Sequence, residues 1–171
     1  MTARVVWITG LSGAGKTTVA EKLAQQLRQA GIPFVGLDGD RLRAIFGEDL
    51  GHSPAERLRL ALRYARLCRE LASQDLTVVC ATISLFHEVH RWNRENIPGY
   101  CEVYLRVPLA ECARRDPKGL YARRGANEIT DLVGLDSRPE EPLAADLVID
   151  NHGGIGPDEA ADMIWQAISA A

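Results

Sequence analysis

The sequence contains no apolar segment that approaches the about 18 uninterrupted residues of a membrane helix, and no basic-then-apolar leader precedes its first apolar stretch. Its four cysteines, Cys68, Cys80, Cys101 and Cys112, lack the C-x-x-C spacing that holds metals or performs redox chemistry. Cys80 and Cys101 lie in apolar stretches, where reduced thiols serve as small core residues. We therefore expect a cytoplasmic protein without a membrane partner.

An excess of charge of one sign is also absent. The 20 basic and 23 acidic residues give a net charge of −3, and the isoelectric point is near 5.8. This balance argues against a surface that coats nucleic acid, so any anionic ligand must be bound locally. The length of 171 residues and the 46% of hydrophobic residues predict a single domain over residues 1–171 with its own core.

Residues 10–17 form a glycine-rich motif directly after the apolar run of residues 5–8. They read Gly-Leu-Ser-Gly-Ala-Gly-Lys-Thr, a complete G-x-x-x-x-G-K-[ST] phosphate-binding loop. A strand that ends in a glycine turn and restarts as a helix directs several backbone N–H groups at one point, which favours a nucleotide triphosphate. The residues expected to bind ATP here are Gly10, Leu11, Ser12, Gly13, Ala14, Gly15, Lys16, Thr17 and Thr18.

Two side chains of this loop have specific predicted roles. Lys16 is predicted to reach the β- and γ-phosphates, and the Thr17 hydroxyl is predicted to be a ligand of Mg²⁺. The alternative interpretation is a glycine turn that caps an ordinary helix. That alternative requires neither Lys16 nor the adjacent hydroxyls of Thr17 and Thr18.

Strand-like and helix-like stretches alternate along the chain. Segments rich in Val, Ile and Leu, as expected for strands covered on both faces, occupy residues 3–9, 33–38, 76–82, 100–107 and 146–150. Helix candidates occupy residues 15–30, 54–74, 86–95, 108–115 and 157–170. This order predicts a three-layer α/β/α fold of the P-loop NTPase type, with a five-stranded parallel sheet and with ligands at the carboxyl ends of the strands.

Local signals mark some element boundaries. Gly31 stands where a glycine would end the first helix, and Ser53-Pro54 gives the second long helix an N-cap followed by proline. The stretch with the weakest element signal is 116–145, which is rich in Gly, Pro, Arg and acidic residues. A loop of this length in a compact domain is typical of a lid.

A second chemical cluster follows the second expected strand, where residues 37–43 read Leu-Asp-Gly-Asp-Arg-Leu-Arg. Phosphoryl transfer needs a group that orients or deprotonates the attacking hydroxyl, and cations that neutralise the transferring charge. Asp40 and Arg43 could supply both functions. Alternatively, Asp38 or Asp40 is only the N-cap of a following helix, because Asp is favoured at that position.

These motifs resemble the adenylylsulfate kinase family over nearly the whole chain. The matching segments are GLSGAGKTT at 10–18, LDGDRLR at 37–43, DLGHSPAER at 49–57, ISLF at 83–86 and RDPKGLY at 115–121. Members transfer the γ-phosphate of MgATP to the ribose 3′-hydroxyl of adenosine 5′-phosphosulfate. The resemblance implies a phosphotransferase that uses ATP and Mg²⁺ with a small-molecule nucleotide acceptor. Members are commonly dimers, so a homodimer is among the expected partners.

Matching positions carry the family's roles over to this chain. The resemblance implies that Asp40 faces the acceptor hydroxyl, with Asp38 beside it, and that Lys118 on the lid acts near both nucleotides. Asp40, Lys16 and Lys118 are thus the expected catalytic residues. Arg114 is expected against the adenine of ATP. Other expected acceptor-binding residues are Arg43, His52, Arg57, Leu60, Ile83, Ser84, Gly119, Leu120 and Leu132.

The expected acceptor pocket departs from the family pattern. Members that use adenosine 5′-phosphosulfate usually carry Phe, Asn, Pro and Phe where this chain has His52, Leu60, Leu85 and Leu132. The two Phe rings sandwich the acceptor adenine, and base–aromatic stacking contributes about 1–3 kcal/mol per contact. The pattern instead resembles a branch of the same family, the cytidine diphosphoramidate kinases, whose pyrimidine is smaller than adenine.

Three functional hypotheses follow. The chain is a kinase of a cytidine diphosphoramidate-like acceptor, an adenylyl-sulfate kinase of sulfate assimilation, or a nucleotide-binding module that has lost its acceptor. The intact Asp40, Arg43 and Lys118 argue against the last of these. A zinc site is not favoured, because His87 and His90 are three residues apart but no carboxylate or thiol cluster accompanies them.

Overall fold

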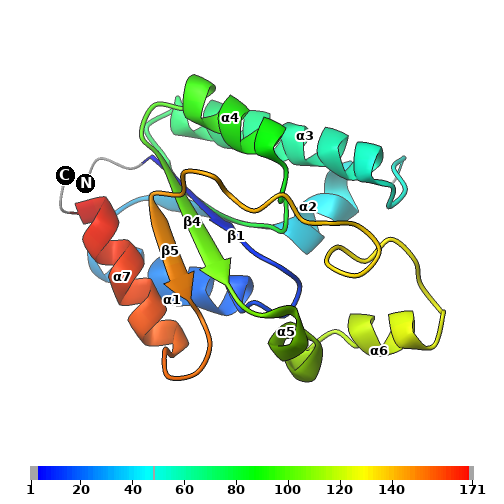
Figure 1. Cartoon of the computed structure of the whole chain (residues 1–171). Helices are drawn as coiled ribbons and strands as arrows, with labels where there is room; N and C mark the ends of the chain where they lie inside the picture. Colours follow the sequence, from blue (N-terminus) through cyan, green and yellow to red (C-terminus); the bar gives the residue numbers. More distant parts are fainter. Residues whose placement is uncertain (1–3, 48, 170–171) are drawn as a thin grey trace.

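The computed structural model describes residues 4–47 and 49–169, and its centre is one parallel sheet (Figure 1). The strands are β1 (Val5–Thr9), β2 (Phe34–Asp38), β3 (Thr77–Ala81), β4 (Tyr100–Arg106) and β5 (Leu147–Asp150). They lie in the order β2-β3-β1-β4-β5, and every neighbouring pair is parallel. The predicted five-stranded parallel sheet is confirmed.

Helices cover both faces of this sheet, as predicted (Figure 1). They are α1 (Lys16–Gln29), α2 (Gly39–Phe46), α3 (Pro54–Ala72), α4 (His87–Asn96), α5 (Leu109–Arg115), α6 (Leu120–Gly125) and α7 (Pro157–Ser169). Ile8 of β1 belongs to a buried cluster with Leu23 of α1 and Ile164 of α7. Trp7, the preceding residue, belongs to a second cluster with residues of α3 and α4. Burial on both faces explains why β1 is apolar at successive positions.

Two short helices lie outside the predicted helix ranges. The first is α2, whose N-cap is Asp38: its carboxylate accepts the backbone N–H of Asp40 at 3.0 Å and that of Arg41 at 3.4 Å. The N-cap is therefore Asp38. Asp40 lies in the first turn of α2, and its side chain does not cap the helix. The second is α6, with six residues, too short to show a helical apolar period.

The predicted boundary signals are confirmed where the structure describes them. Gly31 has a φ of 68°, and the N–H groups of Gly31 and Ile32 donate to the carbonyls of Arg28 and Leu27 at 3.0 Å each, which closes α1. Ser53 and Glu56 form a reciprocal capping box at the start of α3. Residue 170, at the end of the last predicted helix, lies outside the described residues.

The predicted lid stretch 116–145 runs past the carboxyl ends of the strands, with α6 near its start (Figure 1). Its middle is held by Asp136, which accepts hydrogen bonds from Arg124 at 2.6–2.8 Å and from the N–H of Leu132 at 2.8 Å. The Arg57 side chain of α3 donates to the Asp131 carbonyl at 2.7 Å. The stretch is therefore an ordered segment joined to the body by polar contacts.

The four cysteines are buried free thiols, as expected. Across residues 4–47 and 49–169, we find no helix with both the length and the apolar character needed to cross a membrane.

We predict that Ser53→Ala lowers the free energy of unfolding by about 1 kcal/mol, because the N-terminal amides of α3 lose their side-chain acceptor. Chemical denaturation with a circular dichroism readout measures this change. Ser73→Ala, at the C-terminal end of the same helix, is the matched control and should cost less. Equal stability of the wild type and Ser53→Ala would contradict the assigned cap.

Candidate active site

The loop between β1 and α1 is a phosphate-binding turn of well-defined geometry. Gly13 has a φ of 81°, and a β-carbon there would lie 2.8 Å from the carbonyl oxygen of Cys112. Only glycine therefore fits between the loop and α5. Lys16, the first residue of α1, folds back so that its Nζ donates to the Leu11 carbonyl at 2.7 Å. The ammonium group is thus held inside the loop.

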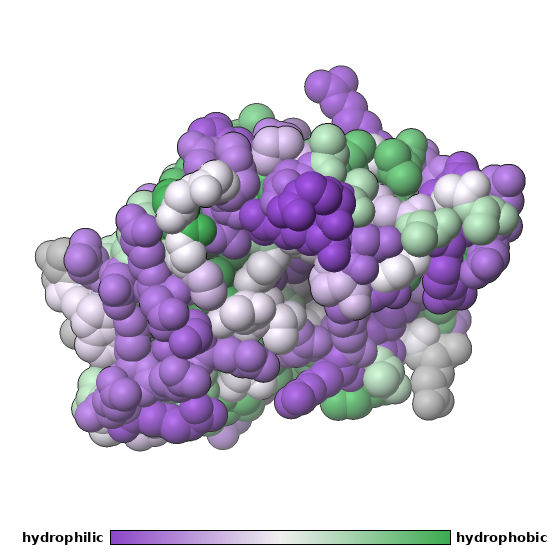
Figure 2. Space-filling view, turned by 90° about the horizontal axis from the view of Figure 1, so that it is seen from below, coloured by the Kyte–Doolittle hydropathy of each residue, from purple (hydrophilic) through white to green (hydrophobic). Residues whose placement is uncertain are grey.

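A cavity of about 1140 Å³ opens beside this loop along the carboxyl ends of the strands. Figure 2 looks onto this side of the molecule and shows a hollow among mainly hydrophilic residues. The expected site residues that line it are Ser12, Gly13, Gly15, Lys16, Thr17, Thr18, Asp38, Asp40, Arg43, Arg57, Leu60, Ile83, Ser84 and Lys118. One cavity therefore collects residues from the loop, from the second cluster and from the start of the lid stretch.

Two polar contacts organise the centre of the cavity. The Thr17 hydroxyl donates to Asp38 Oδ2 at 2.8 Å. Lys118 forms an ion pair with Asp40, which joins the lid stretch to the first turn of α2. Asp40 and Lys118 are both substantially exposed, with side-chain exposures of 69% and 48%. Both charged groups are therefore accessible to a ligand in the cavity.

Arg43 and Arg57, the two arginines expected to bind the acceptor, also form hydrogen bonds to backbone carbonyls of nearby loops. Arg43 donates to the carbonyls of Leu50, at 3.2 Å, and Gly51. Arg57 donates through Nε to the His52 carbonyl at 2.8 Å, in addition to its bond to the lid stretch. Each guanidinium thus fixes a loop, and both arginines line the cavity.

Several expected residues do not line this cavity. His52 is exposed, and Leu132 is buried in the core cluster, with its neighbour Val133 lining the cavity instead. Gly119 is the N-cap of α6 and Leu120 packs against the core. Gly10, Leu11 and Ala14 are buried residues of the phosphate-binding loop itself.

Arg114 lines a second cavity, of about 570 Å³, with Glu111, Arg115 and residues 152–156. Its guanidinium pairs with Glu111 at 2.7 Å. Arg115 lines both cavities and donates to the Asn151 carbonyl at 2.9 Å. The second cavity therefore lies between α5 and the loop after β5, and Arg115 separates it from the phosphate-binding loop.

The family model described as adenylylsulphate kinase matches residues 2–150. The chain belongs to the adenylylsulphate kinase family. An adenylyl-sulfate kinase of Paraburkholderia xenovorans is 44% identical over 147 residues, which cover 85% of this chain and 82% of the relative. A cytidine diphosphoramidate kinase of Campylobacter jejuni is 36% identical over 165 residues, which cover 96% of both chains.

The solved structure of the Mycobacterium tuberculosis APS kinase CysC in complex with AMPPNP and APS has a TM-score of 0.90 to this chain at 36% identity, and the match covers 98% of both. The fold is therefore that of the adenylylsulphate kinases, and the chain is an ATP-binding P-loop kinase of this family. The names of the relatives state two different acceptors, so family membership alone leaves the acceptor open.

Part of the cavity wall was not predicted from the sequence. Tyr64 contributes aromatic surface beside Phe86 of the matching segment 83–86, and Ser137, Arg138 and Glu140 line the cavity from the far end of the lid stretch. Tyr64 follows Leu60 by one helical turn on α3, which is a signal that could have identified it. The residues from 137 to 140 belong to no motif and reach the cavity only through the path of the chain.

The environment of Lys16 changes its acidity. Burial, followed by the positive charge of Lys118, lowers the pKa of the Lys16 ammonium to about 8. A protonated Lys16 attracts phosphate oxygens, and a neutral amine does not. Because a bound polyphosphate favours the charged form, nucleotide binding must be coupled to proton uptake above this pKa.

We therefore predict that the Kd for ATP is about tenfold higher at pH 9 than at pH 7, since about nine-tenths of Lys16 is neutral at pH 9. Isothermal titration calorimetry over this range measures the change. Lys22→Met, which removes another ammonium from α1, should keep the profile, and Lys16→Met should lose it together with most of the affinity. A flat profile in the wild type would contradict the assigned environment.

Proposed function

We propose that this kinase transfers the γ-phosphate of ATP to the ribose 3′-hydroxyl of a cytidine diphosphoramidate-like nucleotide. The choice of acceptor is based on the residues that form the cavity wall near positions 52 and 132. His52 is exposed, Leu132 is buried in the core, and aliphatic Leu60 and Val133 line the cavity instead. Because the His52 imidazole does not line the cavity and Leu132 has no ring, an adenine loses about 1–3 kcal/mol of stacking per contact.

The donor side of the proposal rests on the phosphate-binding loop and the second cavity. The triphosphate lies in the loop, where backbone N–H groups and Lys16 neutralise its charge. The adenine of ATP occupies the second cavity beside Arg114. Arg115, which lines both cavities, is then placed next to the chain of phosphates between them.

The residues around the Asp40–Lys118 ion pair supply the transfer chemistry. Asp40 accepts the proton of the acceptor hydroxyl as the hydroxyl oxygen bonds to the γ-phosphorus and the bond to the leaving oxygen of ADP breaks. Lys118 stabilises negative charge on the transferring group, and its pairing with Asp40 places it at the same point of the cavity. We propose that residues 116–145 act as the lid that carries Lys118 over the reactants.

The oxygen atoms near the loop fit a magnesium ion. The Thr17 hydroxyl and the Asp38 carboxylate are 2.8 Å apart at the edge of the loop, and Mg²⁺ prefers hard oxygen ligands next to substrate phosphates. Thr17, with Asp38 behind it, would hold the ion. When bound, Mg²⁺ neutralises charge on the phosphates of ATP.

Arg43 and Arg57 bind the anionic groups of the acceptor in this proposal. Both line the cavity, Arg43 from α2 and Arg57 from α3. Because their guanidinium groups are already fixed by carbonyls of residues 50–52 and 131, they bind the acceptor with little further loss of side-chain entropy.

Adenosine 5′-phosphosulfate is the second candidate acceptor. The 44% identity to an adenylyl-sulfate kinase favours it, and the rings of Tyr64 and Phe86 in the cavity wall offer other surfaces on which a purine can stack. The test is a direct comparison of kcat/KM for cytidine diphosphoramidate and adenosine 5′-phosphosulfate with ATP as donor. A larger value for the cytidine nucleotide is expected, and a much larger value for the sulfated nucleotide would overturn the choice of acceptor.

We predict that Asp40→Ala lowers kcat by about 10²–10⁴-fold, the typical contribution of a positioned general base, and changes the Kd for ATP by less than about threefold. Steady-state kinetics and calorimetry measure the two effects. Asp75→Asn, whose side chain pairs with Arg4 at the opposite end of the sheet, is the control and should retain activity. Equal losses in kcat and in ATP affinity would make Asp40 a structural or metal-site residue.

A further inference from the structure

The turn that follows β3 forms one wall of the main cavity and has a strained backbone. Residues 82–86 all line the cavity. Ser84, at the centre of the turn, has a φ of 28°, in a region that residues with a side chain rarely adopt. Such a conformation persists only where surrounding contacts hold it. The contacts of Ser84 therefore decide the shape of this wall.

A buried histidine supplies one of these contacts. His90 Nε2 donates to the Ser84 carbonyl at 3.0 Å, and the histidine is only 6% exposed. The Ser84 carbonyl also accepts the N–H of Phe86 at 3.0 Å, and the Ser84 and Thr82 hydroxyls lie 2.8 Å apart. His90 is on α4, so this bond fixes the turn to a helix that does not itself line the cavity.

The other side of the imidazole faces a buried carboxylate. His90 Nδ1 lies 3.6 Å from Glu102 Oε1, and the Glu102 side chain, on β4, is 2% exposed. Tyr100 donates to Glu102 at 3.1 Å, and Arg94 lies 3.4 Å from its other oxygen. Because the Ser84 carbonyl only accepts hydrogen bonds, Nε2 must carry a proton.

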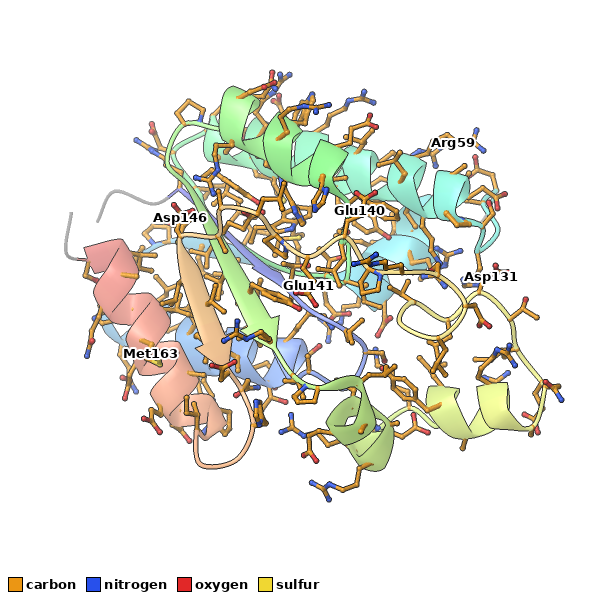
Figure 3. All side chains as sticks on the ribbon, in the orientation of Figure 1. Arg59, Asp131, Glu140, Glu141, Asp146 and Met163 are labelled. Atoms are coloured by element: carbon orange, nitrogen blue, oxygen red, sulfur yellow. The ribbon has the colours of Figure 1, made fainter. Side chains whose placement is uncertain are left out.

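This chain of contacts extends to the surface. Arg94 also pairs at 3.0 Å with Asp146, which lies immediately before β5 (Figure 3). The remaining charged or titratable groups near the imidazole are His87, on the same helix, and Glu140, which accepts the His87 N–H at 2.6 Å. The imidazole thus lies between β4 and the turn after β3. Its hydrogen bond is the one to the Ser84 carbonyl, and the buried Nδ1 has no hydrogen-bond partner among the described residues.

We infer that His90 is a positioning residue for the acceptor: it holds the strained turn at Ser84 in the conformation that shapes the acceptor side of the cavity. This inference rests on the proposed kinase reaction. If the hydrogen bond is removed, the Ser84 carbonyl loses a buried donor and the backbone is free to leave its positive φ. The wall formed by residues 82–86 then moves. The Thr9 hydroxyl, at the end of β1, donates to the Ile83 carbonyl of this wall, but the phosphate-binding loop itself keeps its close packing against Leu105 and Cys112.

His90→Leu removes the donor and keeps a side chain of similar size. We expect kcat/KM for the acceptor to fall about tenfold or more, the effect of losing a buried hydrogen bond, with the Kd for ATP unchanged. His90→Gln, which retains an N–H donor, should keep most of the activity. Arg91→Leu, at an exposed position of α4, is the matched control. An equal loss for acceptor and ATP would overturn the inference.

The Ser84→Gly substitution distinguishes a positioning role of His90 from a role in core packing. Glycine adopts positive φ without strain, so the loss caused by His90→Leu should be at least about threefold smaller in a Ser84→Gly background. In a Ser84→Ala background, which lacks the hydroxyl but retains the strain, the full loss should remain. The same loss in both backgrounds would show that His90 acts only through packing.

Hydrogen exchange tests the same contact without turnover. Amides of residues 82–87 should exchange faster in His90→Leu than in the wild type, and the difference should shrink in the Ser84→Gly background. Unchanged exchange in this segment would overturn the inference. A wild type that phosphorylates neither acceptor would overturn the proposed function instead, and the exchange comparison would still decide the role of His90.

Discussion

The close packing of the glycine-rich loop against its neighbours is the constraint on which the site depends. A β-carbon at Gly10 would lie 2.7 Å from the Leu105 carbonyl oxygen of β4, and the corresponding contact at Gly13 is with α5. The loop can therefore follow only one path between β1 and α1. That path directs its N–H groups and Lys16 into the main cavity, and the remaining reactive groups are arranged around this point.

The order of the strands brings the other groups to the loop. Because β1 lies between β3 and β4, and β2 lies beyond β3, the carboxyl ends of β2 and β3 meet next to the loop. The end of β2 supplies Asp38 and Asp40, and the end of β3 supplies the turn at Ser84. A parallel sheet places ligands at this edge, and here segments about 30 and 70 residues from the loop in sequence reach one cavity.

Much of this arrangement was predictable, because strand periodicity, the loop motif and the β-α order are local features of the sequence. The short helix α2 was foreseen only in the alternative that Asp38 or Asp40 caps a following helix. The ion pair between Lys118 and Asp40 and the contributions of Arg138 and Glu140 depend on the path of a long segment, which local patterns do not encode. The positions of His52, on the surface, and Leu132, in the core, likewise follow from tertiary packing, and the family pattern alone would have placed both in the pocket.

In the proposed reaction, the cavity brings the γ-phosphate of ATP to a ribose 3′-hydroxyl. Phosphorus NMR of the wild-type reaction with ATP and cytidine diphosphoramidate follows this transfer directly. We expect stoichiometric ADP and a new phosphomonoester resonance coupled to the ribose H3′ of the acceptor. Formation of inorganic phosphate alone, or of a phosphoryl group at another position of the acceptor, would contradict it.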